Sequence, residues 1–230
     1  MRTVQDAVAE AGAEVMEVPV EVSGASRTDA GVHAKGQVAA LRGPKPIPPD
    51  RLRQALNAHL PHDVSVLACS LAAEGFDPRR ESVDKRYQYR IWNRRSRSPL
   101  NARTSWHRRG PLDLEAVRLG VPHLLGEHDY STFRSAHCSA PHPIRRLDAI
   151  DAETDGEGLV TLEVQGNAFL HHMVRNLAGT LVEVGQGRRD PASLGELLAS
   201  RDRTLAGPTA PAHGLALLWV GYEGDLTAPR

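Results

Sequence analysis

Apolar residues near the start of the chain recur at the spacing of a helix. They occupy positions 4, 7, 8, 11 and 15, so they share one side of a helix, and Thr3 ahead of them is a residue type that caps helix N-termini. The pattern predicts a helix that ends near Met16. Valines at positions 18, 20 and 22 then alternate with Pro19 and Glu21, which predicts a strand.

Further along, segments with strand and helix periodicity alternate. Helices are expected at residues 51–60, 112–125, 169–184 and 191–200, and strands at residues 37–41, 64–71, 86–92, 144–150, 159–165 and 215–220. This mixture indicates an α+β or α/β architecture. A break at Asp77-Pro78 suggests two lobes, residues 1–78 and residues 79–230.

The segment at residues 86–92 has two different faces. Tyr87, Tyr89 and Ile91 alternate with Arg86, Gln88 and Arg90, so a strand would be apolar on one face and mainly basic on the other. Tyrosines in such a pattern are ordinarily core residues. Beside a basic face they could instead stack on an unstacked nucleotide base.

Composition and charge narrow the class of protein. The chain has 230 residues, of which 40% are hydrophobic and 24% charged, so it is neither disordered nor fibrous. The longest uncharged run, residues 204–222, is interrupted by glycine and proline, and the first residues lack the apolar core of a secretory signal. We therefore expect a cytoplasmic protein without a membrane span.

The formal net charge of zero hides an uneven distribution. Residues 79–109 carry eleven cations against two anions, and all the cations but one are arginine. Because guanidinium binds phosphate through two parallel hydrogen bonds, this block favours a nucleic acid partner. A GC-rich genome would also produce the excess of arginine over lysine seen throughout the chain, although not its clustering.

Two further segments could carry chemistry. Residues 27–34 follow a predicted strand and include Arg27, Asp29, Gly31 and His33. Asp29 could act as a nucleophile or base, or it could belong to an ordinary Asx-turn. In residues 169–184, Arg175 lies among apolar residues and needs an anionic partner, and Asp29 is a suitable one. Alternatively, the Arg175 side chain extends past its apolar neighbours so that its guanidinium reaches solvent.

Metal sites are not supported by the sequence. The adjacent His171 and His172 would point in different directions on a helix, so we interpret them as satisfied or surface histidines. The residues of the Glu127-His128-Asp129 run cannot all face one ion. We therefore predict neither a metal nor a cofactor.

Five ordered motifs together resemble the tRNA pseudouridine synthase A family. They are residues 27–34 (RTDAGVHA), 85–91 (KRYQYRI), 126–133 (GEHDYSTF), 169–179 (FLHHMVRNLAG) and 210–215 (APAHGL). The resemblance implies the α+β pseudouridine synthase fold, with two ferredoxin-like or RNP-like lobes around a basic cleft, and a homodimer. It also implies an isomerase that converts uridines 38, 39 and 40 of the tRNA anticodon stem-loop without a cofactor.

The resemblance assigns roles to individual residues. It implies that Asp29 is the catalytic aspartate, that Tyr87 is the active-site tyrosine and that Arg175 pairs with the aspartate. Arg27 resembles the arginine implicated in tRNA handling and base flipping. From the arginine block, we expect Arg86 and Arg90 to bind the substrate.

One departure from the family keeps alternatives open. Members usually begin with a strand ahead of the first helix, whereas this sequence begins at the helix, so we expect the first lobe to lack that strand. This motivates a second hypothesis, a non-catalytic tRNA-binding protein. A third, a metal-dependent nuclease or hydrolase, would use Asp29, His128 and Asp129.

Overall fold

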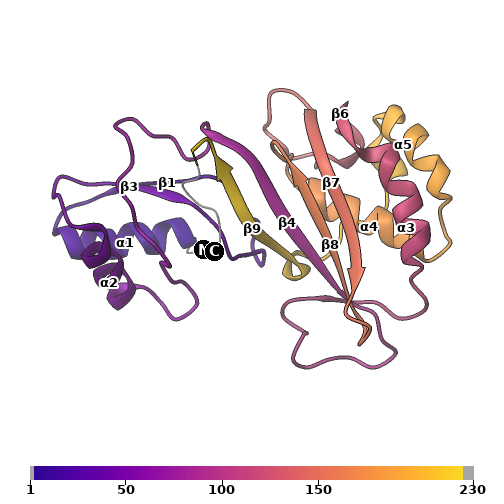
Figure 1. Cartoon of the computed structure of the whole chain (residues 1–230), viewed down its shortest axis with the longest axis horizontal. Helices are drawn as coiled ribbons and strands as arrows, with labels where there is room; N and C mark the ends of the chain where they lie inside the picture. The colour runs from indigo at the N-terminus through magenta and orange to yellow at the C-terminus, as the bar shows by residue number, and fades with distance from the viewer. Residues whose placement is uncertain (1–2, 225–230) are drawn as a thin grey trace. The chain divides into compact units, whose positions relative to one another are not determined.

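The structure, a computed structural model, describes residues 3–224 and has a mixed α+β architecture (Figure 1), as the alternating periodicities predict. Its contacts divide the chain into two compact units. The first unit comprises Met1–Arg27 and Gln37–Ser82, and the second comprises Thr28–Gly36 and Val83–Arg230. No helix in the described part is both long enough and apolar enough to cross a membrane.

The two compact units differ from the two lobes expected from the sequence in the placement of the loop that carries Asp29. The boundary of the lobes at residue 78 stays a prediction. Thr28–Gly36 belongs to the second unit, although it precedes residue 78. The reason is strand pairing: β2 (His33–Ala34) pairs in parallel with β9 (Leu215–Tyr222) near the other end of the chain. Short-range periodicity carries no information about such a long-range pairing.

In the first unit, one helix packs against a small antiparallel sheet and a second helix packs against the first. Its elements are α1 (Val4–Met16), β1 (Glu21–Gly24), β3 (Ala39–Arg42) and α2 (Pro49–His59). As predicted, α1 begins after Thr3, whose side chain accepts from Asp6 N–H while the Asp6 carboxylate accepts from Thr3 N–H. A Cβ on the buried Gly12 would lie 2.7 Å from Val20 Cγ2 and 2.9 Å from Leu41 Cδ1, so a larger residue would require these side chains to shift.

The strand predicted at residues 64–71 is wrong. The segment is irregular, and Leu67 and Leu71 are 77% and 82% exposed. Within the described residues no strand pairs with it. Instead the Asn57 side chain donates to the Val66 carbonyl and accepts from the Val66 N–H. An apolar run gives a strand only where a neighbouring strand satisfies its backbone groups.

The second unit is built on a seven-stranded sheet. Its strand order is β2-β9-β4-β8-β7-β6, with β5 paired to β4 off this path. The remaining strands are β4 (Ser82–Trp92), β5 (Trp106–His107), β6 (Gly126–Asp129), β7 (Ile144–Thr154) and β8 (Leu159–Gly166). Strands β4, β8, β7 and β6 pair antiparallel along their length, so they form a continuous platform.

Burial alternates along the central strands, as period-two patterning requires. In β4, Tyr87, Tyr89 and Ile91 are buried, whereas Arg86 is exposed and Arg90 partly exposed. The prediction of one apolar and one basic face for this strand is confirmed. Alternate residues of β8 are buried in the same way, so the core lies on one side of the sheet.

Three helices of the second unit gather beside its sheet (Figure 1): α3 (Leu114–Gly120), α4 (Met173–Gly185) and α5 (Leu194–Ser200). Of these, α4 is the most deeply buried, with Leu177 and Leu181 at most 1% exposed. It begins four residues later than predicted. The cause is His172, whose left-handed backbone, with φ of 64°, cannot belong to the helix.

Candidate functional site

The loop that carries Asp29 is anchored at the sheet of the second unit. Val32 N–H donates to the Asp29 carbonyl at 3.0 Å, and this turn contains Gly31 at φ of 83°, a left-handed conformation that favours glycine. Past the turn, Lys35 N–H donates to the Leu217 carbonyl of β9. The loop is therefore held by its own turn and, past the turn, by β9.

The Asp29 carboxylate is held by Arg175. Arg175 Nη1 donates to Asp29 Oδ2 at 2.7 Å, and Arg175 Nε donates to the Ala210 carbonyl at 2.8 Å. The Asp29 and Arg175 side chains are only 25% and 14% exposed, respectively. The structure thus brings together the aspartate and the arginine that the sequence could only suggest as partners, and it gives Asp29 an ion pair in place of the Asx-turn alternative.

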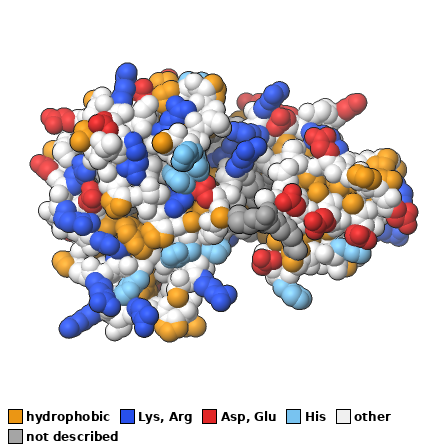
Figure 2. Space-filling model, turned by 180° about the vertical axis from the view of Figure 1, so that it is seen from behind, with side chains coloured by type: hydrophobic (Ala, Val, Ile, Leu, Met, Phe, Trp, Pro, Cys, Tyr) orange, Lys and Arg blue, Asp and Glu red, His pale blue; other side chains and the backbone are white. Residues whose placement is uncertain are grey.

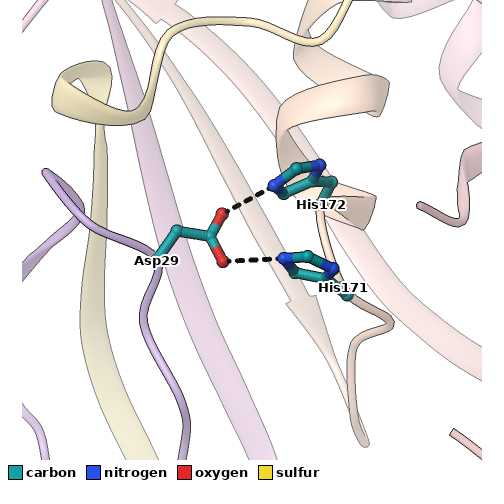
Figure 3. Close-up of side chains that lie close together, drawn as sticks. All are labelled: Asp29, His171 and His172. Carbon is teal, nitrogen blue, oxygen red and sulfur yellow. Dashed lines mark ion pairs between the residues drawn. The ribbon is translucent and has the colours of Figure 1, made fainter. Parts of the chain in front are cut away.

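Two histidines flank the same carboxylate (Figure 3). His171 Nε2 lies 3.2 Å from Asp29 Oδ1, and His172 Nε2 lies 3.2 Å from Asp29 Oδ2. The expectation that these rings point in different directions is wrong, because His172 precedes α4 and its left-handed backbone turns its ring to the side of its neighbour. Helical periodicity offered no signal for this pair, because both histidines precede α4.

Burial affects the charge state of this cluster. It lowers the pKa of the His172 imidazole, and the nearby His171, Arg175 and Arg203 act in the same direction, whereas the Asp29 carboxylate opposes them. His172 is therefore mainly neutral at pH 7. Arg175 then provides the permanent positive charge beside Asp29.

A buried polar network holds the start of α4. Asn176, fully buried, accepts from Arg203 and Thr209 and donates to the Phe133 carbonyl at 2.8 Å. Ala210 N–H donates to the Arg175 carbonyl, so the segment that receives the Arg175 side chain is also tied to its backbone. Satisfied buried networks of this kind are rigid, and this one fixes the position of the guanidinium.

Both tyrosines of β4 lie on its buried face. Tyr87 packs edge-on against Phe169, and their ring centroids lie 5.1 Å apart. Phe169 precedes His171 by two residues. Tyr89 donates from its hydroxyl to the Pro211 carbonyl at 2.8 Å, and burial raises its pKa. The structure thus places Tyr87 beside the segment that carries the histidines, and Tyr89 beside the segment that binds Arg175.

The predicted substrate-binding arginines are not gathered around Asp29. Arg86 and Arg90 lie on the face of β4 opposite Tyr87. Arg86 donates to Gln165, and Arg90 donates to Thr104 and Asn101. Arg27 is exposed, precedes Asp29 by two residues and belongs to the first compact unit.

The residues of the metal-dependent hydrolase hypothesis are not brought together either. Asp129 pairs with Arg201 at 3.3 Å, and His128 Nε2 contacts the Leu125 carbonyl. In the described part of the chain, the potential metal ligands that lie close to Asp29 are instead His171 and His172, with ligand atoms within 4.8 Å of one another.

Comparison with known proteins identifies the family of this chain. A family model described as tRNA pseudouridine synthase matches residues 1–75 and 121–223, which include Asp29 and Arg175. The match therefore covers most of the chain and both compact units.

Individual relatives are similar over nearly the whole chain. A protein of Myxococcus xanthus named tRNA pseudouridine synthase A is 51% identical over 94% of this chain and 82% of its own length. Proteins of the same name from Geotalea uraniireducens and Methylobacterium nodulans are 42% and 44% identical, over 96% and 99% of this chain and 90% of their own lengths. The chain belongs to the tRNA pseudouridine synthase family.

Proposed function

We propose that this protein converts uridine to pseudouridine in tRNA, at positions 38, 39 and 40 of the anticodon stem-loop. The observation that carries the proposal is the Asp29 carboxylate, held at 2.7 Å by Arg175 in a largely buried setting. The relatives, all named tRNA pseudouridine synthase A, support the reaction, and the resemblance of the motifs supports the three positions.

The reaction requires an ionised group close to the target nucleoside. The bond between N1 of uracil and C1′ of ribose breaks, the base turns, C5 bonds to C1′ and loses its proton, and N1 takes up a proton. Asp29 supplies the reacting carboxylate. Arg175 orients that carboxylate through its contact at 2.7 Å.

Tyr87 and Phe169 provide the apolar side of the site. Their edge-on contact leaves the Tyr87 ring in a fixed orientation beside the His171 segment. We assign to Tyr87 the stacking on the target uracil and assistance in removing the C5 proton. Aromatic rings are suited to holding a base that has left its helix, since every base offers a stacking face.

The three exposed or partly exposed arginines would contact the tRNA outside the reacting centre. We assign Arg27 to handling of the flipped nucleotide, and Arg86 and Arg90 to the phosphate backbone. Figure 2 shows many Lys and Arg side chains over the visible face of the larger unit, on the left of that view. Such a surface suits a polyanion that extends beyond the target base.

Two further expectations, on cellular location and oligomeric state, belong to the same proposal. We infer that the protein acts in the cytoplasm, because its proposed substrate is tRNA, and that it forms a homodimer, because the family resemblance implies one. Analytical ultracentrifugation at micromolar concentration tests the second inference. A single species of 25.0 kDa would contradict it, since that is the mass of one chain.

The proposal is tested by incubating the protein with tRNA that carries tritium at C5 of its uridines. We expect tritium release to water, together with pseudouridine at positions 38 to 40 when the product is mapped. The non-catalytic alternative is not favoured by the names of the relatives, and it expects salt-dependent tRNA binding without release. Release with pseudouridine at other positions would retain the reaction and reject the proposed sites.

A further inference from the structure

Asp29, His171 and His172 together form a set of potential metal ligands (Figure 3). The two imidazole Nε2 atoms lie 3.2 Å from the two carboxylate oxygens, and one ligand atom from each residue lies within 4.8 Å of the others. Two imidazoles and one carboxylate are a donor set that suits borderline divalent ions such as Zn²⁺.

The backbone arranges these donors in a strained conformation. His172 adopts φ of 64° although it is not glycine, and residues with a side chain rarely adopt this left-handed region. As a result, the rings of these adjacent residues lie side by side, with centroids 4.0 Å apart and planes tilted by 39°, and both face one carboxylate. The residues on either side of the pair, Leu170 and Met173, are buried.

The donors lie close enough together to converge on one small ion. With bonds of about 2.0–2.1 Å, the donors of a tetrahedral Zn²⁺ lie about 3.3 Å apart. Each Nε2 atom lies 3.2 Å from a different oxygen of the carboxylate, and one ligand atom from each residue lies within 4.8 Å of the others, so small side-chain movements would bring three donors to one ion. His171, His172 and Asp29 are 38%, 27% and 25% exposed, so an ion can reach them from solvent. A fourth position would remain open to water.

We propose that Asp29, His171 and His172 form a reversible, inhibitory binding site for Zn²⁺ or a similar divalent transition-metal ion. Reversibility follows from Arg175, which already neutralises Asp29 at 2.7 Å. The two charges of the ion would therefore be only partly compensated, and binding is weaker than at a structural zinc site.

Inhibition follows from the shared carboxylate. An ion bound to Asp29 occupies the oxygen lone pairs that the reaction needs, so bound metal and turnover exclude each other. This consequence rests on the proposed function of Asp29, whereas ion binding itself does not.

Binding is tested with Co²⁺ as a spectroscopic probe and with Zn²⁺ by isothermal titration calorimetry, in the absence of tRNA. We expect one equivalent of Co²⁺ to give visible absorption bands of a four-coordinate site without a thiolate charge-transfer band, and Zn²⁺ to displace it. The variants His171→Gln, His172→Gln and Asp29→Asn should each weaken Zn²⁺ binding by at least about tenfold. Circular dichroism confirms that each variant is folded.

His62→Gln is the matched control, because His62 is an exposed histidine in the first compact unit. Its Zn²⁺ affinity should equal that of the wild type. Equal affinity of His171→Gln, His172→Gln and the wild type would overturn the site, because the ion would then bind elsewhere.

A second arm measures tritium release from tRNA with increasing Zn²⁺. We expect inhibition at the concentration that fills the site, and recovery after EDTA is added. Filling of the site without loss of turnover would overturn the inhibitory role. If the metal-free protein releases no tritium while Zn²⁺ still binds at these residues, the proposed function fails and the metal site stands.

Discussion

A single guanidinium positions the Asp29 carboxylate, the proposed reacting group. Arg175 donates to Asp29 through Nη1 and to the Ala210 carbonyl through Nε, so two hydrogen bonds fix the position of its guanidinium. Lysine carries the same charge but has one nitrogen, which cannot make both contacts in this geometry. The residue type at position 175 therefore matters beyond its charge.

The variants Arg175→Gln and Arg175→Lys test this point. Arg175→Gln should lower the turnover number for tRNA by about 10²–10³-fold and the free energy of unfolding by about 2–3 kcal/mol, because it leaves Asp29 without its counter-charge. Arg175→Lys should recover part of both quantities. Turnover by Arg175→Gln at the wild-type rate would show that Asp29 does not depend on this ion pair.

The tyrosines of β4 offer a matched pair of substitutions. Tyr89→Phe removes the hydroxyl bond to Pro211 and should cost about 1 kcal/mol of stability with little loss of turnover. Tyr87→Phe keeps the ring packed against Phe169 and should lower turnover by about 10²-fold, because it removes the proposed proton acceptor. Thermal unfolding and tritium release measure the two effects. Equal turnover in both variants would remove Tyr87 from the chemistry.

At the level of elements, α4 connects packing to the site. It presents Arg175 near its start, and Gly179, one turn further, lies against the segment that contains Pro208. A Cβ at position 179 would lie 1.8 Å from the Pro208 carbonyl oxygen, so backbone would have to move. The same segment continues to Ala210, which receives the Arg175 side chain.

Gly179→Ala should therefore destabilise the protein by about 3 kcal/mol and lower turnover, because it displaces the 208–210 segment from α4. Gly195→Ala in α5 is the control. There the nearest atom, in His123, lies 3.6 Å from the added Cβ, and the helix should gain about 0.5–1 kcal/mol. Chemical denaturation compares the two variants. A neutral Gly179→Ala would show that the segment is free to shift.

Local patterns predicted some elements well and others poorly. The capped helix α1 and the two-faced strand β4 follow from residues close in the sequence, and the structure has both. The strand expected at residues 64–71 did not form because it lacks a pairing partner among the described residues, which periodicity does not encode. The start of α4 was misplaced because His172 has a left-handed backbone, and the histidine pair was misinterpreted for the same reason.

For the whole molecule, charge distribution matters more than net charge. The chain is formally neutral, yet residues 79–109 concentrate arginine. The sequence revealed this block, but not that β4 turns Arg86 and Tyr87 to opposite faces of one sheet. We expect the arginines to bind the tRNA backbone and the buried face to carry the chemistry.

Binding of tRNA should therefore depend on salt. Affinity should fall by at least about tenfold between 50 and 200 mM salt, because phosphate contacts release counterions. Arg86→Gln should reduce the slope of log affinity against log salt by about one, while the bound enzyme turns over normally. Fluorescence anisotropy across a salt series measures the slope. An unchanged slope in Arg86→Gln would place that arginine outside the tRNA contact.

The most direct measurement compares wild-type protein and Asp29→Asn on tRNA that carries tritium at C5 of its uridines. The substitution keeps the shape of the side chain but removes its charge. We predict that the wild type releases tritium and that Asp29→Asn releases none above background, while both proteins bind the tRNA with similar affinity. Release by Asp29→Asn at the wild-type rate would contradict the central role of this carboxylate.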